Sequence, residues 1–270
     1  MTHWKPVYAV LEREVVRMFR QRTRLVSAMV RPLIWLFVIG AGFGTVLQEA
    51  GGLSYQHFLV PGVLGMTMLF GAMLAALTMV YDKESGVMRM LVMAPFAHYW
   101  IVIAKMLSAA LAALLQAVLL VALLAMLRYV DSGTRFALLA LALLMTSAAC
   151  AGIGMLVAAF TRTLDNFAAI MNFVIFPVFF LSGSLYPVNR LPAALKSVAL
   201  MNPYTYGVDL LKHSVLGAIP SGMGADFAIS TDVVVLAGFT GAALLIASWR
   251  FSRESAYEPM IRILSGKRDA

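Results

Sequence analysis

The chain has 270 residues, of which 61% are hydrophobic and only 13% are charged, and it carries a formal net charge of +8. Globular domains contain about twice that share of charged residues, so this composition excludes a disordered chain and argues against a soluble enzyme or a nucleic-acid-binding protein. With a mean hydropathy of +0.86, the sequence predicts an all-α membrane protein whose positive charge lies mainly on one side of the bilayer.

Six apolar stretches are close to the roughly 20 helical residues that a bilayer core of about 30 Å requires. We expect transmembrane helices at residues 30–47, 58–81, 101–127, 136–160, 166–185 and 231–249. The chain would then have three parts: a cytoplasmic amphipathic N-terminal helix (1–29), a six-helix transmembrane domain (30–249) and a basic cytoplasmic tail (250–270).

Lysine and arginine residues are distributed unevenly between the two sides of these predicted spans. Sixteen of the 21 lie in the N-terminal segment, the second connection with the start of the third span, the fourth connection and the tail. The other connections contain only five. Because positive charge collects on the cytoplasmic side, both termini are predicted to be cytoplasmic, which agrees with an even number of spans.

The segment before the first span has the pattern of an amphipathic helix. Between Trp4 and Phe19 the apolar residues recur at i, i+3, i+4 and i+7, and arginines occupy much of the other face. Such a helix lies in the headgroup layer with its basic face toward anionic lipid. Periodicity leaves two interpretations open, a topology anchor or an element that transmits motion to the first span.

The second cytoplasmic connection begins with three charged residues, Asp82, Lys83 and Glu84, and continues as a short helix that Pro95 ends. Met88 and its neighbours one turn later share one face of this helix. Methionine-rich faces suit a groove in a partner protein. The alternative is an ordinary solvated loop.

Two stretches resemble the ABC-2 type transporter permeases. The first, Asp82-Lys83-Glu84-x-Gly86 continuing through Leu91 to Pro95, is similar to the coupling-helix motif of that family. The second reads Leu181-Ser182-Gly183-Ser184-Leu185-Tyr186-Pro187, then Leu191-Pro192, then Asn202-Pro203-Tyr204-Thr205-Tyr206-Gly207-Val208-Asp209-Leu210-Leu211. Val87, Ala94 and Lys212 are mild departures from the residues that are common in the family. The resemblance covers almost the whole chain.

The resemblance implies the permease subunit of an ATP-binding cassette exporter in a cytoplasmic (inner) membrane, working with a second copy of itself. It also implies a separate ATPase subunit that docks on the coupling helix. The residues implied in this contact are Asp82, Lys83, Glu84, Gly86, Arg89, Leu91 and Pro95. No Gly-x-x-x-x-Gly-Lys-[Ser/Thr] phosphate loop occurs in the sequence, so ATP and Mg²⁺ are expected in the partner and no enzymatic activity is expected in this chain.

The predicted spans contain no ionisable residue at their centres. Arg31, Lys105, Asp165 and Asp232 stand near span ends, where side chains can reach the interface. This pattern argues against a proton-coupled antiporter or a channel with a charged ring. The four histidines lie in separate segments, and the single cysteine is Cys150, so neither a metal site nor a disulfide is expected.

Three further groups of residues are candidates for function. The aromatic fifth span either packs against lipid or lines a hydrophobic substrate path between two copies, through Asn172, Phe173, Phe176, Pro177 and Phe180. Residues 191–216 are predicted to form short helices at the outer interface and an external gate, through Asn202, Pro203, Tyr204 and Tyr206. Gly40 and Gly44 allow close helix packing, either within the chain or at a dimer interface.

The sequence thus predicts a permease that moves a hydrophobic or lipid-linked substrate outward with energy from ATP. One alternative is a membrane anchor that recruits an ATPase without transporting anything. The other is a membrane-embedded enzyme that modifies lipid, which would require clustered polar groups at membrane depth.

Overall fold

The computed structural model describes residues 8, 11–13, 16, 30–46, 54–88, 99–130, 133–217 and 224–265, with the side chains of the last helix described as far as Arg253. Every regular element in these residues is a helix, as the composition predicts. The elements are η1 (Trp35–Ile39), α3 (Gly40–Val46), α4 (Tyr55–Glu84), α6 (Tyr99–Met126), α7 (Phe136–Phe160), α8 (Leu164–Phe180), η2 (Val188–Arg190), α9 (Ala193–Met201), α10 (Pro203–Val215) and α11 (Ile229–Ser265).

Four of these helices, α4, α6, α7 and α11, are long and apolar enough to cross a membrane. Two shorter apolar helices, Val30–Gly44 and Leu164–Phe180, overlap the first and fifth predicted spans but are shorter than the four long helices. The first contains the π-helical turn η1. The fifth has 17 residues, about 25 Å of helix, and it ends at Phe180 rather than near residue 185.

Helix α8 continues through its internal proline. Pro177 lies inside α8, and its carbonyl oxygen accepts a hydrogen bond from the backbone N–H of Leu181 at 3.0 Å. The helix ends instead at a turn in which the backbone N–H of Ser182 donates to Phe179. A proline in the last turn removes only one helical hydrogen bond, so the helix continues through it.

Helix α4 is the centre of the bundle and packs against η1, α3, α6, α7, α8 and α10. Small residues let its neighbours come close. A Cβ atom on Gly62 would collide with the backbone oxygen of Ser184, and one on Gly154 of α7 would lie 2.9 Å from the Cβ of Ala76. Close packing of this kind leaves α4 mostly buried, as expected of a helix whose sequence is apolar all round.

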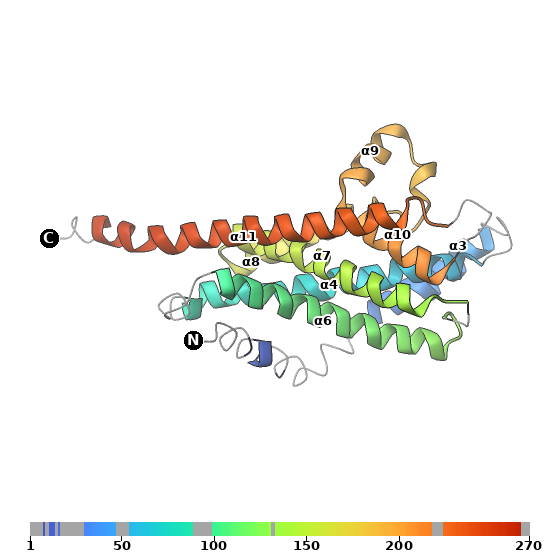
Figure 1. Ribbon diagram of the computed structural model, residues 1–270, viewed down its shortest axis with the longest axis horizontal. Helices are drawn as coiled ribbons and strands as arrows, with labels where there is room; N and C mark the ends of the chain where they lie inside the picture. Colours follow the sequence, from blue (N-terminus) through green and yellow to red (C-terminus); the bar gives the residue numbers. More distant parts are fainter. Residues whose placement is uncertain are drawn as a thin grey trace.

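The helices lie side by side along the molecule: α4, α6, α7 and α8 run in alternating directions, and α11 runs in the same direction as α7 (Figure 1). At one end of the bundle, called the Glu84 end here, the last turn of α4 meets the end of α7 and the start of α8. At the opposite end, called the Tyr55 end, the hydroxyl of Tyr55 donates to the carbonyl oxygen of Leu185. The two ends therefore bring together segments that are far apart in sequence.

The two short helices before α11 differ from the expectation that both lie on an outer surface. Helix α9 projects from the side of the bundle (Figure 1), and its Leu195, Val198 and Met201 are exposed. Helix α10 instead packs inside the bundle between α4, α7 and α11, with nearly every side chain buried. The close approach of Gly207 to Thr146 of α7 permits this position, since a Cβ there would lie 2.7 Å from the threonine methyl group.

The structure describes only part of the predicted N-terminal helix and of the predicted basic tail. Helix α11 continues without a break from the apolar stretch into the basic segment, as far as Ser265, so residue 249 does not mark a change in secondary structure. Most of the predicted amphipathic helix at residues 4–19 lies outside the described residues.

Candidate functional site

The first residue of the charged motif, Asp82, is buried in the last turn of α4. Its carboxylate oxygen Oδ2 lies 2.5 Å from Nζ of Lys105 in α6 and 3.4 Å from a guanidinium nitrogen of Arg13. The lysine was expected to extend to the membrane surface, but its side chain is buried against the carboxylate. Asp82 therefore holds α4, α6 and the N-terminal segment together.

The second residue, Lys83, caps the C-terminal end of α7. Its ammonium group donates to the carbonyl oxygens of Ala158 at 3.0 Å, Ala159 at 3.2 Å and Thr161 at 3.4 Å. The last carbonyls of a helix have no helical partner and carry the negative end of the helix dipole. A lysine from α4 supplies both the missing donors and the complementary charge.

The third residue, Glu84, contacts the start of α8. Its Oε2 atom accepts a hydrogen bond from the backbone N–H of Leu164 at 2.8 Å. Thr163 caps the same helix, because its hydroxyl accepts from the N–H of Asn166 at 3.3 Å. Negative charge at a helix N-terminus is favourable, so Glu84 fixes the position of α8 relative to α4.

The turn after α4 depends on glycine. Gly86 has a φ of +78°, a left-handed conformation that glycine adopts without strain. Met88, which the sequence assigned to a surface for a partner, is buried in the core of the same chain. Arg89, Leu91 and Pro95 lie outside the described residues. The charged motif therefore has a structural role within the chain, because its three consecutive side chains connect α4 to three other helices.

The residues proposed for a substrate path lie together on an open face of α8. Asn172, Phe173, Phe176, Pro177 and Phe180 are all exposed, and Phe173 is the most exposed of the phenylalanines at 80%. The opposite face is buried through Phe167, Ile175 and Phe179. Trp35 of η1 contacts this helix at its end, with ring centroids 5.6 Å from Phe179 and 6.0 Å from Phe180.

The residues proposed for an outer gate form the start of α10. The side-chain oxygen of Asn202 accepts from the backbone N–H of Tyr204 at 3.1 Å, and its amide nitrogen donates to Val178 of α8 at 2.7 Å. Pro203 occupies the first helical turn, which proline favours. The rings of Tyr204 and Tyr206 are buried. This segment is thus fixed to α8 and the bundle core.

The two glycines of the first span have different surroundings. A Cβ atom on Gly40 would lie 2.9 Å from the Cγ atom of Gln56 in α4, whereas one on Gly44 would have nothing within 4 Å among the described residues. Gly40 therefore serves packing within the chain, and Gly44, which is partly buried, has no close neighbour among the described residues.

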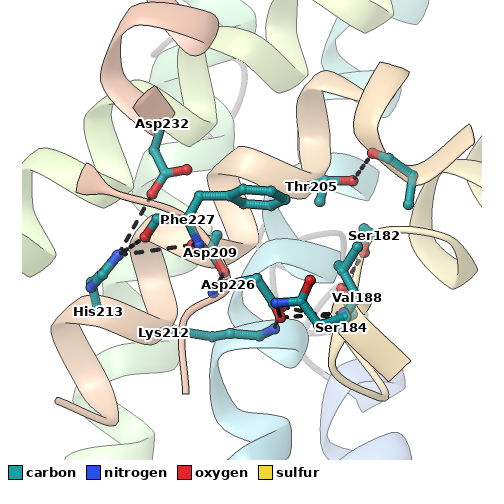
Figure 2. A network of polar contacts seen from close by, with 12 residues as sticks. Ser182, Ser184, Val188, Thr205, Asp209, Lys212, His213, Asp226, Phe227 and Asp232 are labelled. Carbon is teal, nitrogen blue, oxygen red and sulfur yellow. Dashed lines mark hydrogen bonds and ion pairs between the residues drawn. The ribbon is translucent and has the colours of Figure 1, made fainter. Parts of the chain in front are cut away.

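A buried polar network, which the sequence did not predict, joins α10 to the segment before α11 (Figure 2). Asp226 accepts hydrogen bonds from the backbone N–H groups of Val188 at 3.1 Å and Asn189 at 3.3 Å, and its Oδ2 lies 3.3 Å from Nζ of Lys212. Asp209 accepts from the backbone N–H groups of Asp226 at 2.7 Å and Phe227 at 3.0 Å. Burial nevertheless raises the pKa of Asp209 above its usual value.

His213 and Asp232 complete this network. The Nε2 atom of His213 lies 2.8 Å from the carbonyl oxygen of Phe227, 3.8 Å from Asp209 and 3.9 Å from Asp232. Asp232 in the first turn of α11 is fully buried, although its position suggested a side chain that reaches the interface. The i, i+4 spacing of Asp209 and His213 was a signal in the sequence, but Asp226 and Asp232 join them only through the fold.

The sequence is similar to known transport proteins over most of its length. The family model described as "ABC-2 type transporter" matches residues 6–216. Nodulation protein J of Rhizobium leguminosarum bv. viciae is 30% identical over 189 residues, which cover 69% of this chain and 72% of that protein. The putative transport permease ycf38 of Porphyra purpurea is 25% identical over 77% of this chain and 72% of its own length. The inner membrane transport permease YadH of Escherichia coli K12 is 23% identical over 80% of this chain and 84% of its own. With its apolar helices and the motif at the end of α4, the chain belongs to the ABC-2 family of membrane transport permeases.

Proposed function

We propose that this chain is the transmembrane subunit of an ATP-driven exporter, located in an inner membrane with both termini cytoplasmic. A separate ATPase subunit would bind ATP and Mg²⁺ and dock on the connection that follows Glu84. Two copies of the chain would form the working transporter together with two ATPase subunits. Six membrane-crossing helices would comprise the four long ones, the helix at residues 30–46 and α8.

The observation that carries this proposal is the set of contacts made by Asp82, Lys83 and Glu84. They connect the start of the docking loop to α6, to the end of α7 and to the start of α8. A displacement of that loop by the ATPase would therefore move several helices at once. Packed interfaces of this kind change between discrete arrangements rather than deforming gradually.

The exposed face of α8 supports the choice of substrate class. Phe173, Phe176 and Phe180 present aromatic rings away from the core of their own chain, and an aromatic surface favours an apolar or lipid-linked substrate. Between two copies, this face together with the helix at residues 30–46 would line the path. The buried start of α10 lies at the Tyr55 end, where it would control the outer side of that path.

The test is purification of the full chain from its native membranes in mild detergent, with identification of the proteins that come with it. We expect an ATP-binding cassette subunit in a 1:1 ratio, and ATP hydrolysis by the complex that responds to hydrophobic substrates. A stable preparation without an ATPase would contradict the proposal. An ATPase that binds but never responds to any substrate would favour a membrane anchor instead.

A further inference from the structure

Three side chains from two helices converge at the Tyr55 end of the bundle. Asp209 and His213 lie one turn apart on α10, and Asp232 lies in the first turn of α11. One oxygen from each carboxylate and one imidazole nitrogen all lie within 4.8 Å of one another. Figure 2 shows the contacts from both carboxylates meeting at a single nitrogen of His213.

Asp232 carries the strongest indication of a missing partner. Its side chain is fully buried, and neither of its carboxylate oxygens accepts a hydrogen bond from any described residue. The Nε2 atom of His213 lies 3.9 Å from one of its oxygens, beyond hydrogen-bond distance. A buried carboxylate without hydrogen bonds is unfavourable unless another charge compensates it.

The balance of charge in the whole network also indicates a missing cation. Three carboxylates, those of Asp209, Asp226 and Asp232, are buried around one buried ammonium group, that of Lys212. That lysine lies against Asp226 at 3.3 Å, whereas the described ion-pair contacts of Asp209 and Asp232, at 3.8 and 3.9 Å, are made to the imidazole of His213. A divalent cation between these two carboxylates would neutralise the excess negative charge.

We propose that Asp209, His213 and Asp232 form a binding site for a divalent transition-metal cation, with Zn²⁺ as the best match. Two carboxylates and one imidazole are ligands that zinc accepts. Ligand atoms around a tetrahedral zinc ion lie about 3.4 Å apart, so the histidine-to-carboxylate distances of 3.8 and 3.9 Å need to shorten by about half an ångström. Asp232 is free to move in this way because no described hydrogen bond holds it.

The partly exposed imidazole gives a metal ion access to the site, and it makes metal binding depend on pH. The side chain of His213 is 21% exposed, whereas both carboxylates are buried. Its Nε2–H group donates to the carbonyl oxygen of Phe227, because a carbonyl only accepts. When Nε2 ligates a metal ion, the imidazole proton lies on Nδ1 instead, and the carbonyl oxygen of Phe227 beside Nε2 becomes the fourth ligand. Metal ligands bind in their deprotonated forms, so binding weakens as the pH falls.

The histidine spacing predicted no metal site, since no two histidines are close in sequence. The proposed site uses one histidine with two carboxylates, and one of the carboxylates comes from another helix. The ion would join the second half of α10 to the first turn of α11. This proposal concerns the stability of the Tyr55 end and does not depend on transport activity.

The experiment uses the full chain in detergent, treated with EDTA and then titrated with Zn²⁺, with metal content and melting temperature as readouts. We expect one Zn²⁺ per chain, a melting temperature that rises with Zn²⁺ concentration, and much weaker binding of Mg²⁺, which prefers oxygen ligands. Wild-type protein that binds no Zn²⁺, or that prefers Mg²⁺, would overturn the proposal whatever the variants do.

The variants Asp232→Asn and His213→Gln should each weaken Zn²⁺ binding by at least about tenfold. The matched control His57→Gln changes a histidine at the same end of the bundle that contacts Ser54 and the ring of Tyr129, and it should bind Zn²⁺ like the wild type. If all three variants retain the wild-type affinity, the ion binds elsewhere and the assignment is wrong.

Discussion

The carboxylate of Asp82 and the ammonium group of Lys105 form an ion pair at 2.5 Å, with both side chains buried between α4 and α6. Removing one member of a buried pair leaves the other charge uncompensated, which costs about 3–5 kcal/mol. We expect Asp82→Asn and Lys105→Met each to destabilise the protein strongly, and the double variant to lose much less than the sum. Unfolding in detergent measures this coupling, and additivity within about 0.5 kcal/mol would contradict it.

The contact between Glu84 and the start of α8 should matter for transport more than for folding. Glu84→Ala removes the acceptor for the N–H of Leu164, which should reduce the stability of that helix end by about 1 kcal/mol. We expect export to fall while the ATPase subunit still binds and hydrolyses ATP. Glu84→Gln keeps an acceptor oxygen, so it should retain more export than alanine. Equal export by the wild type and both variants would remove Glu84 from the coupling mechanism.

The backbone at Gly86 predicts a graded series of variants. A left-handed conformation costs other residues about 1–2 kcal/mol, asparagine somewhat less, and proline cannot adopt it because its φ is fixed near −65°. With φ at +78° in the structure, export should decrease in the order Gly86, Gly86→Asn, Gly86→Ala, Gly86→Pro. Export is compared at equal amounts of membrane-inserted protein. If Gly86→Pro exports as well as the wild type, the left-handed turn is not required for export.

A pair of variants can distinguish a substrate-lining role of the exposed face of α8 from simple contact with lipid. Phe173 is 80% exposed on α8, and Leu245 is 72% exposed on α11. Neither side chain contributes much to the core, so serine at either position should change stability by no more than about 0.5 kcal/mol. If the α8 face lines the substrate path, Phe173→Ser reduces export and Leu245→Ser does not. Equal effects would assign both residues to contact with lipid.

Variants at Gly40 and Gly44 of the first span can separate an effect on dimerisation from an effect on folding. Gly40→Leu would push against Gln56 and should destabilise the single chain by about 1–3 kcal/mol. Gly44→Leu meets no described residue within 4 Å, so the single chain should tolerate it. A dimer interface at Gly44 predicts that this variant loses crosslinking between copies at normal expression. Unchanged crosslinking would move the interface away from this position.

The sequence identified the long helices well because their lengths and apolar character are local properties. The fourth predicted span coincides with α7 (Phe136–Phe160), the second lies inside α4, and the third ends one residue beyond α6. The fifth was less accurate, because the predicted span continued through Ser182 and Gly183, where the structure has a turn with Gly183 at a φ of +76°. The exposed aromatic residues of α8 were likewise visible in the sequence, although which of its faces is buried was not.

Burial of charged and polar residues was the main point at which the sequence misled. Lys105 and Asp232 stand near the ends of apolar runs, where side chains commonly reach the interface, yet both are buried. Helix α10 has an amphipathic sequence typical of a surface helix but packs between three others. In each case the packing of other parts of the chain decides burial: Asp82 holds Lys105, α10 covers Asp232, and three helices cover α10.

The sequence by itself determined that this is a helical membrane protein of the ABC-2 family, because apolar length, charge asymmetry and a motif of consecutive residues are all encoded locally. Only the tertiary structure decided what the charged residues contact. It directs Asp82, Lys83 and Glu84 to three different helices, and it brings Asp232 to Asp209 and His213 across α10 and α11. The physical reason is that a buried charge requires a partner within a few ångströms, and that distance is set by how the helices pack.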